Sequence, residues 1–275
     1  MTTILNWTYD DNNRYHRWFR TAVITITSLV CFVFAWWDVS ILLNSTAIPT
    51  PLETWHALVD LVVNGDSITG GRTVWAYIAS SLRTFLLGFL LALVVAVPLG
   101  LIIGYSKTIR EFANPVIEVM RPIAPIAWAP IFILAIDYTL GPILVVFIGI
   151  FFPVLTNVVF GVQKIDPNLM DAARTMGASS TQVFYKVMVP SAVPYLMNGV
   201  KVGLGVGWMC IVAAELYAPQ LGGIGYYLST MATNGLWPNA FAAIVVIAIL
   251  GILTTGLAEY IHCLLYTSPS PRDCS

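Results

Sequence analysis

Six apolar stretches, each about as long as a membrane span, run along this chain with polar segments between them. A transmembrane helix needs about 20 apolar residues at a rise of about 1.5 Å each. The stretches that fit lie at about 19–37, 78–104, 112–136, 140–162, 195–217 and 239–261. The pattern therefore predicts an all-α polytopic membrane protein with six transmembrane helices.

The polar segment 38–74 separates the first span from the second. It contains Pro49 and Pro51 and then an amphipathic stretch around Trp55 to Val63. Such a stretch is typical of a helix that lies in the membrane interface rather than crossing the bilayer. We therefore expect residues 38–74 to be an extracytoplasmic linker with an interfacial segment.

The composition excludes most other classes. Of the 275 residues, 58% are hydrophobic and 10% are charged, and the mean hydropathy is +0.81. Soluble domains are about 45–50% apolar and about 25% charged, so this chain has too few charges to cover a soluble enzyme. The same numbers exclude intrinsic disorder. The net charge of −1 gives no sign of a nucleic-acid partner, and the lipid bilayer is the indicated surrounding.

Lysine and arginine counts predict the orientation, because cytoplasmic loops carry an excess of both. Only Arg72 falls on the side that holds 38–74 and the uncharged loop 218–238. The other side holds eight basic residues: Arg14, Arg17, Arg20, Lys107, Arg110, Lys164, Arg174 and Lys186. Residues 1–18 and the loops at 105–111 and 163–191 are therefore expected in the cytoplasm.

Cysteines and histidines give no sign of a metal or catalytic site. The four cysteines show no paired spacing, and the three histidines are scattered. Residues 263–275, with Pro269 and Pro271, do not fit the preceding pattern and resemble translated read-through of a sequencing adapter. We expect them to be a non-native tail, with a short native polar tail as the alternative.

The long loop between the fourth and fifth spans predicts two short helices. Asp166 is a good N-cap, and Pro167 suits the first helical position. A helix should run to about Met176, and Gly177 should end it in the left-handed conformation. Ser179 starts a possible capping box for a second helix, expected to end before Pro190. Small and apolar residues on such a loop suggest a docking surface.

This loop resembles the EAA loop of the permease subunits of ABC importers. The family motif is Glu-Ala-Ala, three residues, Gly, nine residues and Ile-x-Leu-Pro. Every spacing is kept here, with Asp for Glu and Val for both Ile and Leu. The matching residues, expected to couple the chain to an ATPase, are Asp171, Ala172, Ala173, Gly177, Val187, Val189 and Pro190.

The resemblance extends over about residues 75–259, the expected permease core with the type-1 importer fold, and is greatest to the nitrate/sulfonate/taurine branch. It implies two permease copies, a pair of ATPase subunits and an extracytoplasmic binding protein in a prokaryotic plasma membrane. The chain has no Gly-x-x-x-x-Gly-Lys-Ser/Thr loop, so it should bind no cofactor itself, and ATP should be used by the partner subunit. The candidate pathway or gate residues are Arg83, Arg121, Pro122, Pro125, Trp128 and Glu215.

Several of these residues have a structural alternative. The prolines after Arg121 would break a helix, either along a translocation pathway or as a packing kink. Glu118 and Arg121 could pair on one helix face or act as a gate. Glu215 beside an anion pathway would need a partner such as Arg83. Gly199, Gly203 and Gly207 form a stripe that favours close helix packing.

Two other functions are alternatives to the importer permease, which would move a small anion by alternating access. An ion-coupled secondary transporter would need titratable groups near the bilayer centre, and the sequence offers few. A membrane-embedded enzyme would need a polar catalytic cluster, which the pattern does not contain.

Overall fold

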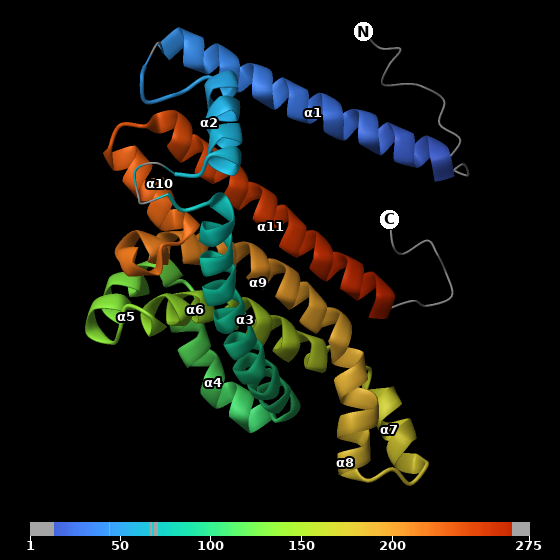
Figure 1. Cartoon of the computed structure of the whole chain (residues 1–275). Coiled ribbons are helices and arrows are strands. Elements are labelled where there is room, and N and C mark those ends of the chain that lie inside the picture. The colour runs from blue at the N-terminus through green and yellow to red at the C-terminus, as the bar shows by residue number, and fades with distance from the viewer. Residues whose placement is uncertain (1–13, 44, 67, 69–70, 266–275) are drawn as a thin grey trace.

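The computed structural model describes residues 14–43, 45–66, 68 and 71–265, and the regular elements among them are all helical (Figure 1). In chain order they are α1 (Arg14–Leu43), α2 (Pro51–Val63), α3 (Val74–Tyr105), α4 (Lys107–Met120), η1 (Pro125–Trp128), α5 (Ala129–Ala135), α6 (Leu140–Gln163), α7 (Pro167–Thr175), α8 (Ser180–Val183), the π-helix η2 (Phe184–Met188), α9 (Val189–Tyr217), η3 (Pro219–Leu221), α10 (Ile224–Thr233) and α11 (Trp237–Leu265). The expected tail lies outside this description from residue 266 onward.

Five stretches of the described helices are long and apolar enough to cross a membrane: Phe19–Leu43, Val74–Tyr105, Leu140–Gln163, Ser180–Tyr217 and Trp237–Ile261. The sixth candidate is α4 together with η1 and α5, which meet at a bend of 82°. The all-α membrane fold is thus confirmed, with six spans when the bent pair counts as one. The first span is longer than the pattern suggested, because apolar residues resume after Asp38.

The bend in the third span follows from its prolines. Helix α4 ends at Met120, and η1 begins at Pro125. A proline lacks the N–H that continues a helix and disfavours helical backbone at the residue before it. Two prolines within four positions therefore interrupt the hydrogen-bond ladder, as the sequence predicted.

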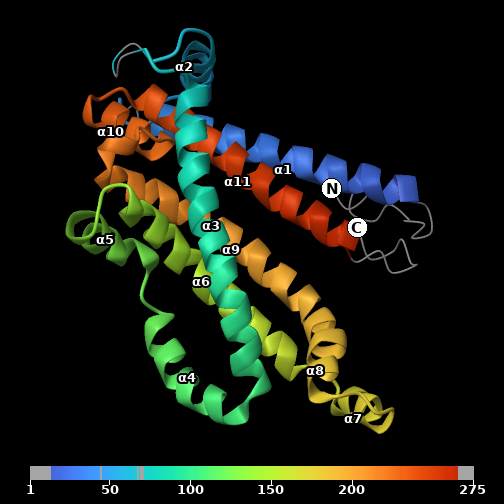
Figure 2. The ribbon, with the colours of Figure 1, turned by 60° about the horizontal axis from the view of Figure 1, so that its bottom comes forward.

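Helix α6 lies at the centre of the bundle and packs against α3 and α9 (Figure 2). The predicted glycine stripe of α9 faces α6. A Cβ added to Gly203 would lie 3.0 Å from the Ile150 side chain, and one added to Gly207 would lie 2.8 Å from it. The expectation that this stripe permits close packing is therefore confirmed.

Two clusters of buried apolar residues lie at opposite ends of the bundle. The α2–α10 cluster joins α2, the start of α3, α10 and α11; its buried members are Leu61, Val74, Tyr77, Ile224, Tyr227, Met231, Ala240, Ala243 and Val246. The α7–α9 cluster lies beside α7 and α8; its members are Val162, Met188 and Ala192, with Leu101, Ile165, Met170 and Phe184 packed against them. Both views place α7 and α8 far from α2 and α10 (Figures 1 and 2).

Helix α10 was not foreseen, since the sequence indicated only an uncharged loop at 218–238. It forms because Ile224, Tyr227 and Met231 recur at helical spacing and are all buried in the α2–α10 cluster. Burying these side chains stabilises a ten-residue helix that would be too short to persist alone in water.

Candidate functional site

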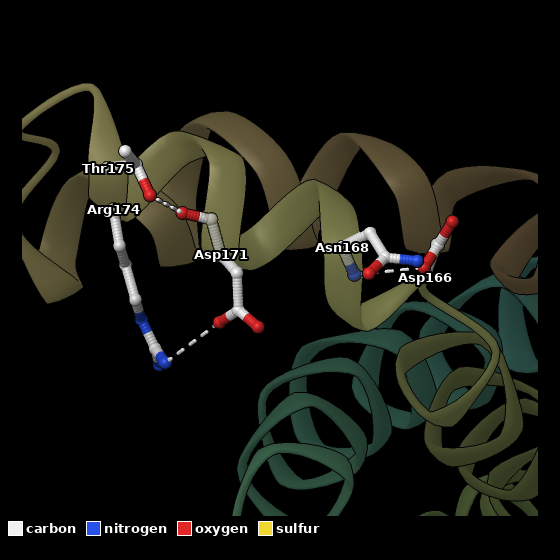
Figure 3. Close-up of polar contacts among 5 residues, drawn as sticks. All are labelled: Asp166, Asn168, Asp171, Arg174 and Thr175. Carbon is white, nitrogen blue, oxygen red and sulfur yellow. Dashed lines mark hydrogen bonds and ion pairs between the residues drawn. The ribbon is translucent and has the colours of Figure 1, made fainter.

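Helix α7 begins as its sequence predicts. Asp166 is the N-cap, and its carboxylate accepts a hydrogen bond from the Asn168 N–H at 2.9 Å (Figure 3). Pro167 occupies the first turn, where its missing N–H costs nothing. Further along, the Thr175 hydroxyl donates to the Asp171 carbonyl oxygen at 2.8 Å. Local hydrogen bonds are therefore made at both the start and the last turn of this helix.

Gly177 ends α7 in a Schellman motif. The Gly177 N–H donates to the Arg174 carbonyl at 2.9 Å, and the Ala178 N–H donates to the Ala173 carbonyl at 3.1 Å. The φ angle of Gly177 is +86°, the left-handed region that glycine adopts without strain. The predicted stop is confirmed in its mechanism as well as its position.

The second helix starts as predicted but does not end as predicted. Ser179 and Gln182 form the expected capping box, with the Ser179 N–H donating to Gln182 Oε1 at 2.9 Å. The helix then continues through the π-turns of η2 into α9, so the expected end before Pro190 is wrong. Pro190 is the second residue of α9, which directly follows η2, so the missing N–H of Pro190 falls where the helix changes from π-turns to α-turns. We call residues 166–190 the α7–α8 hairpin.

The α7–α8 hairpin has one face turned inward and one turned outward. Met170 and Phe184 pack on the α7–α9 cluster, which attaches the hairpin to the spans. On the outer face Leu169 is 51% exposed, Met176 83% and Tyr185 66%. Such side chains normally prefer burial, so the hairpin carries exposed apolar area that its own packing does not cover.

The matched motif residues divide between these faces. Asp171 is exposed and lies 3.6 Å from the Arg174 guanidinium (Figure 3). Ala172 is exposed, but Ala173 is buried where α7 packs on α8, so only the first alanine contributes to the surface. Of the motif's second half, Val187 and Val189 are half-buried, and Pro190 is exposed.

The candidate pathway residues are spread over three elements. Arg83 is exposed on α3, Arg121 and Pro122 are exposed at the bend after α4, and Trp128 stacks on Phe132 with ring centroids 5.7 Å apart. Pro125 begins η1 and is half-buried. The structure thus gathers Arg121, Pro122, Pro125 and Trp128 at or beside the bend, whereas Arg83 lies on α3 and Glu215 lies on α9.

Two expected ion pairs do not form. Glu118 and Arg121 are both exposed and are not among the ion pairs of the described residues. An exposed pair of this spacing is worth only about 0.2–0.5 kcal/mol, so little holds it together. Arg83 is not the partner of Glu215 either. The partner is Ser81, and Arg83 lies on the opposite face of α3 from Ser81.

Glu215 is fully buried, at 0% exposure, where α9, α3 and α10 meet. The Ser81 hydroxyl donates to Glu215 Oε1 at 2.6 Å, and the Gly225 N–H donates to Oε2 at 2.7 Å. A carboxylate is therefore satisfied here without a basic residue. Sequence reasoning missed this arrangement, because a hydroxyl and a backbone N–H leave no charge pattern to find.

Comparison with known proteins agrees with this architecture. Residues 96–263 match the family described as binding-protein-dependent transport system inner membrane component. The taurine transport system permease protein TauC of Escherichia coli (strain K12) is 31% identical over 259 residues, which are 92% of this chain and 93% of that protein. The nitrate import permease protein NrtB of Leptolyngbya laminosa is 31% identical over 210 residues, 76% of this chain and 74% of that one.

A solved structure described as "Crystal structure of an amino acid ABC transporter with histidines" has the same fold, with a TM-score of 0.51. It is 16% identical and the match covers 70% of this chain and 92% of that chain. The bundle and its projecting hairpin thus define a transmembrane subunit of an ABC importer.

The chain belongs to the binding-protein-dependent transport system inner membrane component family, and the resemblance to the nitrate/sulfonate/taurine branch is confirmed. It is a multi-pass membrane transport subunit and not itself an enzyme. It forms a translocation pathway, and its family works with ATPase and substrate-binding partners. The ion-coupled secondary transporter is not favoured.

Proposed function

We propose that this subunit carries a small anion of the nitrate, sulfonate or taurine class across the plasma membrane by alternating access. The names of its taurine and nitrate relatives support this substrate class. The single observation that carries the mechanism is the α7–α8 hairpin, capped at each start and exposing apolar side chains at one end of the bundle. Two copies of the chain would enclose the pathway.

The hairpin is the proposed contact with a separate ATPase subunit, which binds and hydrolyses the ATP. Leu169, Met176 and Tyr185 supply exposed apolar area for that contact, and Asp171 supplies a charge at its edge. The attachment of Met170 and Phe184 to the α7–α9 cluster gives a rigid path from the hairpin into the spans. Closure of the ATPase pair would then tilt the helices that the hairpin joins.

The bend between α4 and η1 is the proposed lining of the pathway. Backbone that interrupts a helix within a membrane is tolerated where it is buried in protein or lines water. Arg121 and Pro122 are exposed on this copy, so an aqueous pathway between two copies would accommodate them. Arg121, and Arg83 on α3, are the cations that would meet an anionic solute.

The orientation that fits this mechanism places the N-terminus and the hairpin in the cytoplasm. Helix α2 then lies at the outer surface, and its three faces suit an interface. Thr54 and Leu61 are buried against the protein, while Glu53, His56 and Asp60 share a polar face. The third face is apolar and exposed, and it is formed by Leu52, Trp55, Val59, Val62 and Val63. Lipid headgroups and acyl chains are the proposed cover for that third face.

Ala173→Trp tests the coupling role. An indole cannot fit the buried position between α7 and α8, so the hairpin should open while the spans, which pack elsewhere, still insert. In detergent, capture of the ATPase by the variant should fall at least tenfold, and uptake in vesicles should be lost. Ala172→Ser, at the exposed neighbouring position, is the matched control. Normal ATPase capture and uptake by Ala173→Trp would refute the coupling role.

The substrate class is tested in vesicles that hold the whole importer. Uptake of radiolabelled taurine, of nitrate and of an alkanesulfonate is measured separately, and uptake of at least one of them should require ATP and the binding protein. Uptake of none of the three solutes would refute the proposed class. Uptake driven by a proton or sodium gradient without ATP would refute the importer mechanism itself.

A further inference from the structure

The outer end of α9 is tied to two other helices by one buried carboxylate. Glu215 accepts from the Ser81 hydroxyl of α3 at 2.6 Å and from the Gly225 N–H of α10 at 2.7 Å. Ser81 in turn accepts from the Ile224 N–H at 2.9 Å. The side chains of Glu215 and Ser81 therefore engage the first two N–H groups of α10, and we call these contacts the Glu215 junction.

Helix α10 depends on this junction for its start. Its own N-cap, Gly223, offers no side chain, and no side-chain cap is made there. The first N–H groups of a helix lack partners within it and carry a partial positive charge, which a carboxylate stabilises. Glu215 thus performs from α9 the task that a capping residue usually performs from within the same helix.

Gly223 and Gly225 of α10 also pack tightly against the Glu215 junction. A Cβ on Gly223 would overlap the Glu215 carboxyl group. A Cβ on Gly225 would lie 2.7 Å from the Val212 carbonyl oxygen and 3.0 Å from the Glu215 Cβ. The backbone of α10 is therefore pressed onto α9, and the two cannot shift relative to each other without breaking these contacts.

Helix α9 reaches the α7–α8 hairpin at the end opposite to Glu215. Ser180–Tyr217 is one continuous apolar helical stretch of 38 residues, about 57 Å long at 1.5 Å per residue. Figure 1 shows it running from the hairpin to the end of the bundle where α10 and α2 lie. A displacement at the hairpin would therefore arrive at Glu215, and from there at α10 and the α2–α10 cluster.

We propose that Glu215 is a positioning residue that transmits movement of α9 to α3 and α10, and so couples the hairpin to the outer face. This inference rests on the proposed function, in which the hairpin docks on the ATPase and the outer face receives the binding protein. Loss of the junction would leave both docking surfaces in place but disconnect them.

The test uses the complete importer in vesicles and measures the ratio of ATPase rates with and without the loaded binding protein. In Glu215→Leu that ratio should fall at least fivefold, because two donors lose their acceptor. Ser81→Ala should reduce it less, because the Gly225 bond survives. Glu215→Gln should restore much of it, since the amide oxygen can accept from Gly225 while its NH₂ donates to Ser81.

Thr84→Val is the matched control, because Thr84 is buried on the same helix as Ser81 but its hydroxyl donates to the Ser80 carbonyl of that helix, at 3.3 Å. A normal ratio in Glu215→Leu, or an equal loss in Thr84→Val, would overturn the inference. The inference would also be overturned if Glu215→Leu failed to assemble while Ser81→Ala kept a normal ratio. Those two results together would assign Glu215 a purely structural role. An inactive wild-type importer would instead refute the proposed function, and this inference with it.

Discussion

Gly177→Val is the substitution whose cost the structure defines most clearly. The φ angle at Gly177 is +86°, and a Cβ built there meets no atom within 4 Å. A Cβ therefore meets no steric obstacle, and the expected penalty comes from the backbone. A β-branched residue held in the left-handed region costs about 1–3 kcal/mol.

That strain should weaken the binding of the ATPase subunit to the hairpin. The hairpin can escape the strain only by leaving the conformation in which Gly177 and Ala178 close the end of α7. If the ATPase binds only the closed hairpin, its apparent dissociation constant rises as the closed fraction falls. A penalty of about 1–3 kcal/mol then weakens binding by at most about 5- to 150-fold, the limit being reached when the hairpin is mostly open.

Gly235→Val is a closely matched control. Gly235 has a φ of +75° and an equally empty surrounding, but it lies in the turn between α10 and α11, at the other end of the bundle. It should carry the same strain without weakening ATPase binding. Gly177→Asn is a second control, since asparagine tolerates the left-handed region better than valine and should recover most of the affinity.

The assay is titration of the detergent-solubilised permease with the purified ATPase subunit. The strain argument fails if Gly177→Val binds within twofold of the wild type, or if Gly235→Val weakens binding as much. It also fails if Gly177→Asn is no better than Gly177→Val, because the defect would then not come from backbone conformation.

Three further predictions address the hairpin charge, the topology and α2. Asp171→Ala should weaken ATPase binding less than tenfold in the same titration, since an exposed ion pair contributes about 0–1 kcal/mol; a larger loss would show a more direct contact. Asn168→Cys and Asn234→Cys, in a background without other cysteines, should react with an impermeant maleimide from opposite sides of the membrane; labelling from one side would refute the six-span topology. A fluorophore on Trp55→Cys should be quenched by nitroxide lipids and one on His56→Cys by aqueous iodide, and equal aqueous quenching would place α2 away from the interface.

The parts of the site that the sequence could predict are those held by neighbouring residues. Asp166 caps a residue two positions away, Ser179 and Gln182 cap each other over three positions, and Gly177 closes its motif within five. Each interaction requires particular residue types at fixed short spacings. The sequence alone therefore contained all the information that the local geometry needed.

The Glu215 junction shows what short spacings cannot predict. Ser81 lies 134 positions from Glu215 in the chain, and its contact depends on how α3 packs beside α9. Reasoning from charge proposed Arg83 instead, because an arginine is the usual partner of a buried carboxylate. Two positions along a helix turn a side chain about 200° around the axis, so the choice between these neighbours needed the packing.

Pro190 was misinterpreted for a different reason. A proline signals either the end of one helix or the first turn of the next, and the pattern favoured the first meaning. The structure has η2 just before it, where the Val189 N–H donates to the Phe184 carbonyl five positions back. This wider turn carries the helix from α8 into α9, so the hairpin and the span are one continuous element.

That continuity gives the polar residues of α9 a common interpretation. Hydrogen bonds between side chains join α9 to three of its neighbours, α6, α11 and α3. They link Asn198 to Asn157 of α6 at 2.8 Å, Lys201 to Glu259 of α11 at 2.6 Å, Trp208 to Thr254 of α11 at 2.8 Å, and Glu215 to Ser81 of α3 at 2.6 Å. Polar groups in a membrane are costly unless they find partners, so these contacts favour one arrangement of α9 among its neighbours. Lys201 and Glu215 do not pair with each other; each bonds a different helix. A helix that starts at the hairpin proposed to meet the ATPase and is bonded at four levels to the rest of the bundle is well placed to move the bundle as a unit.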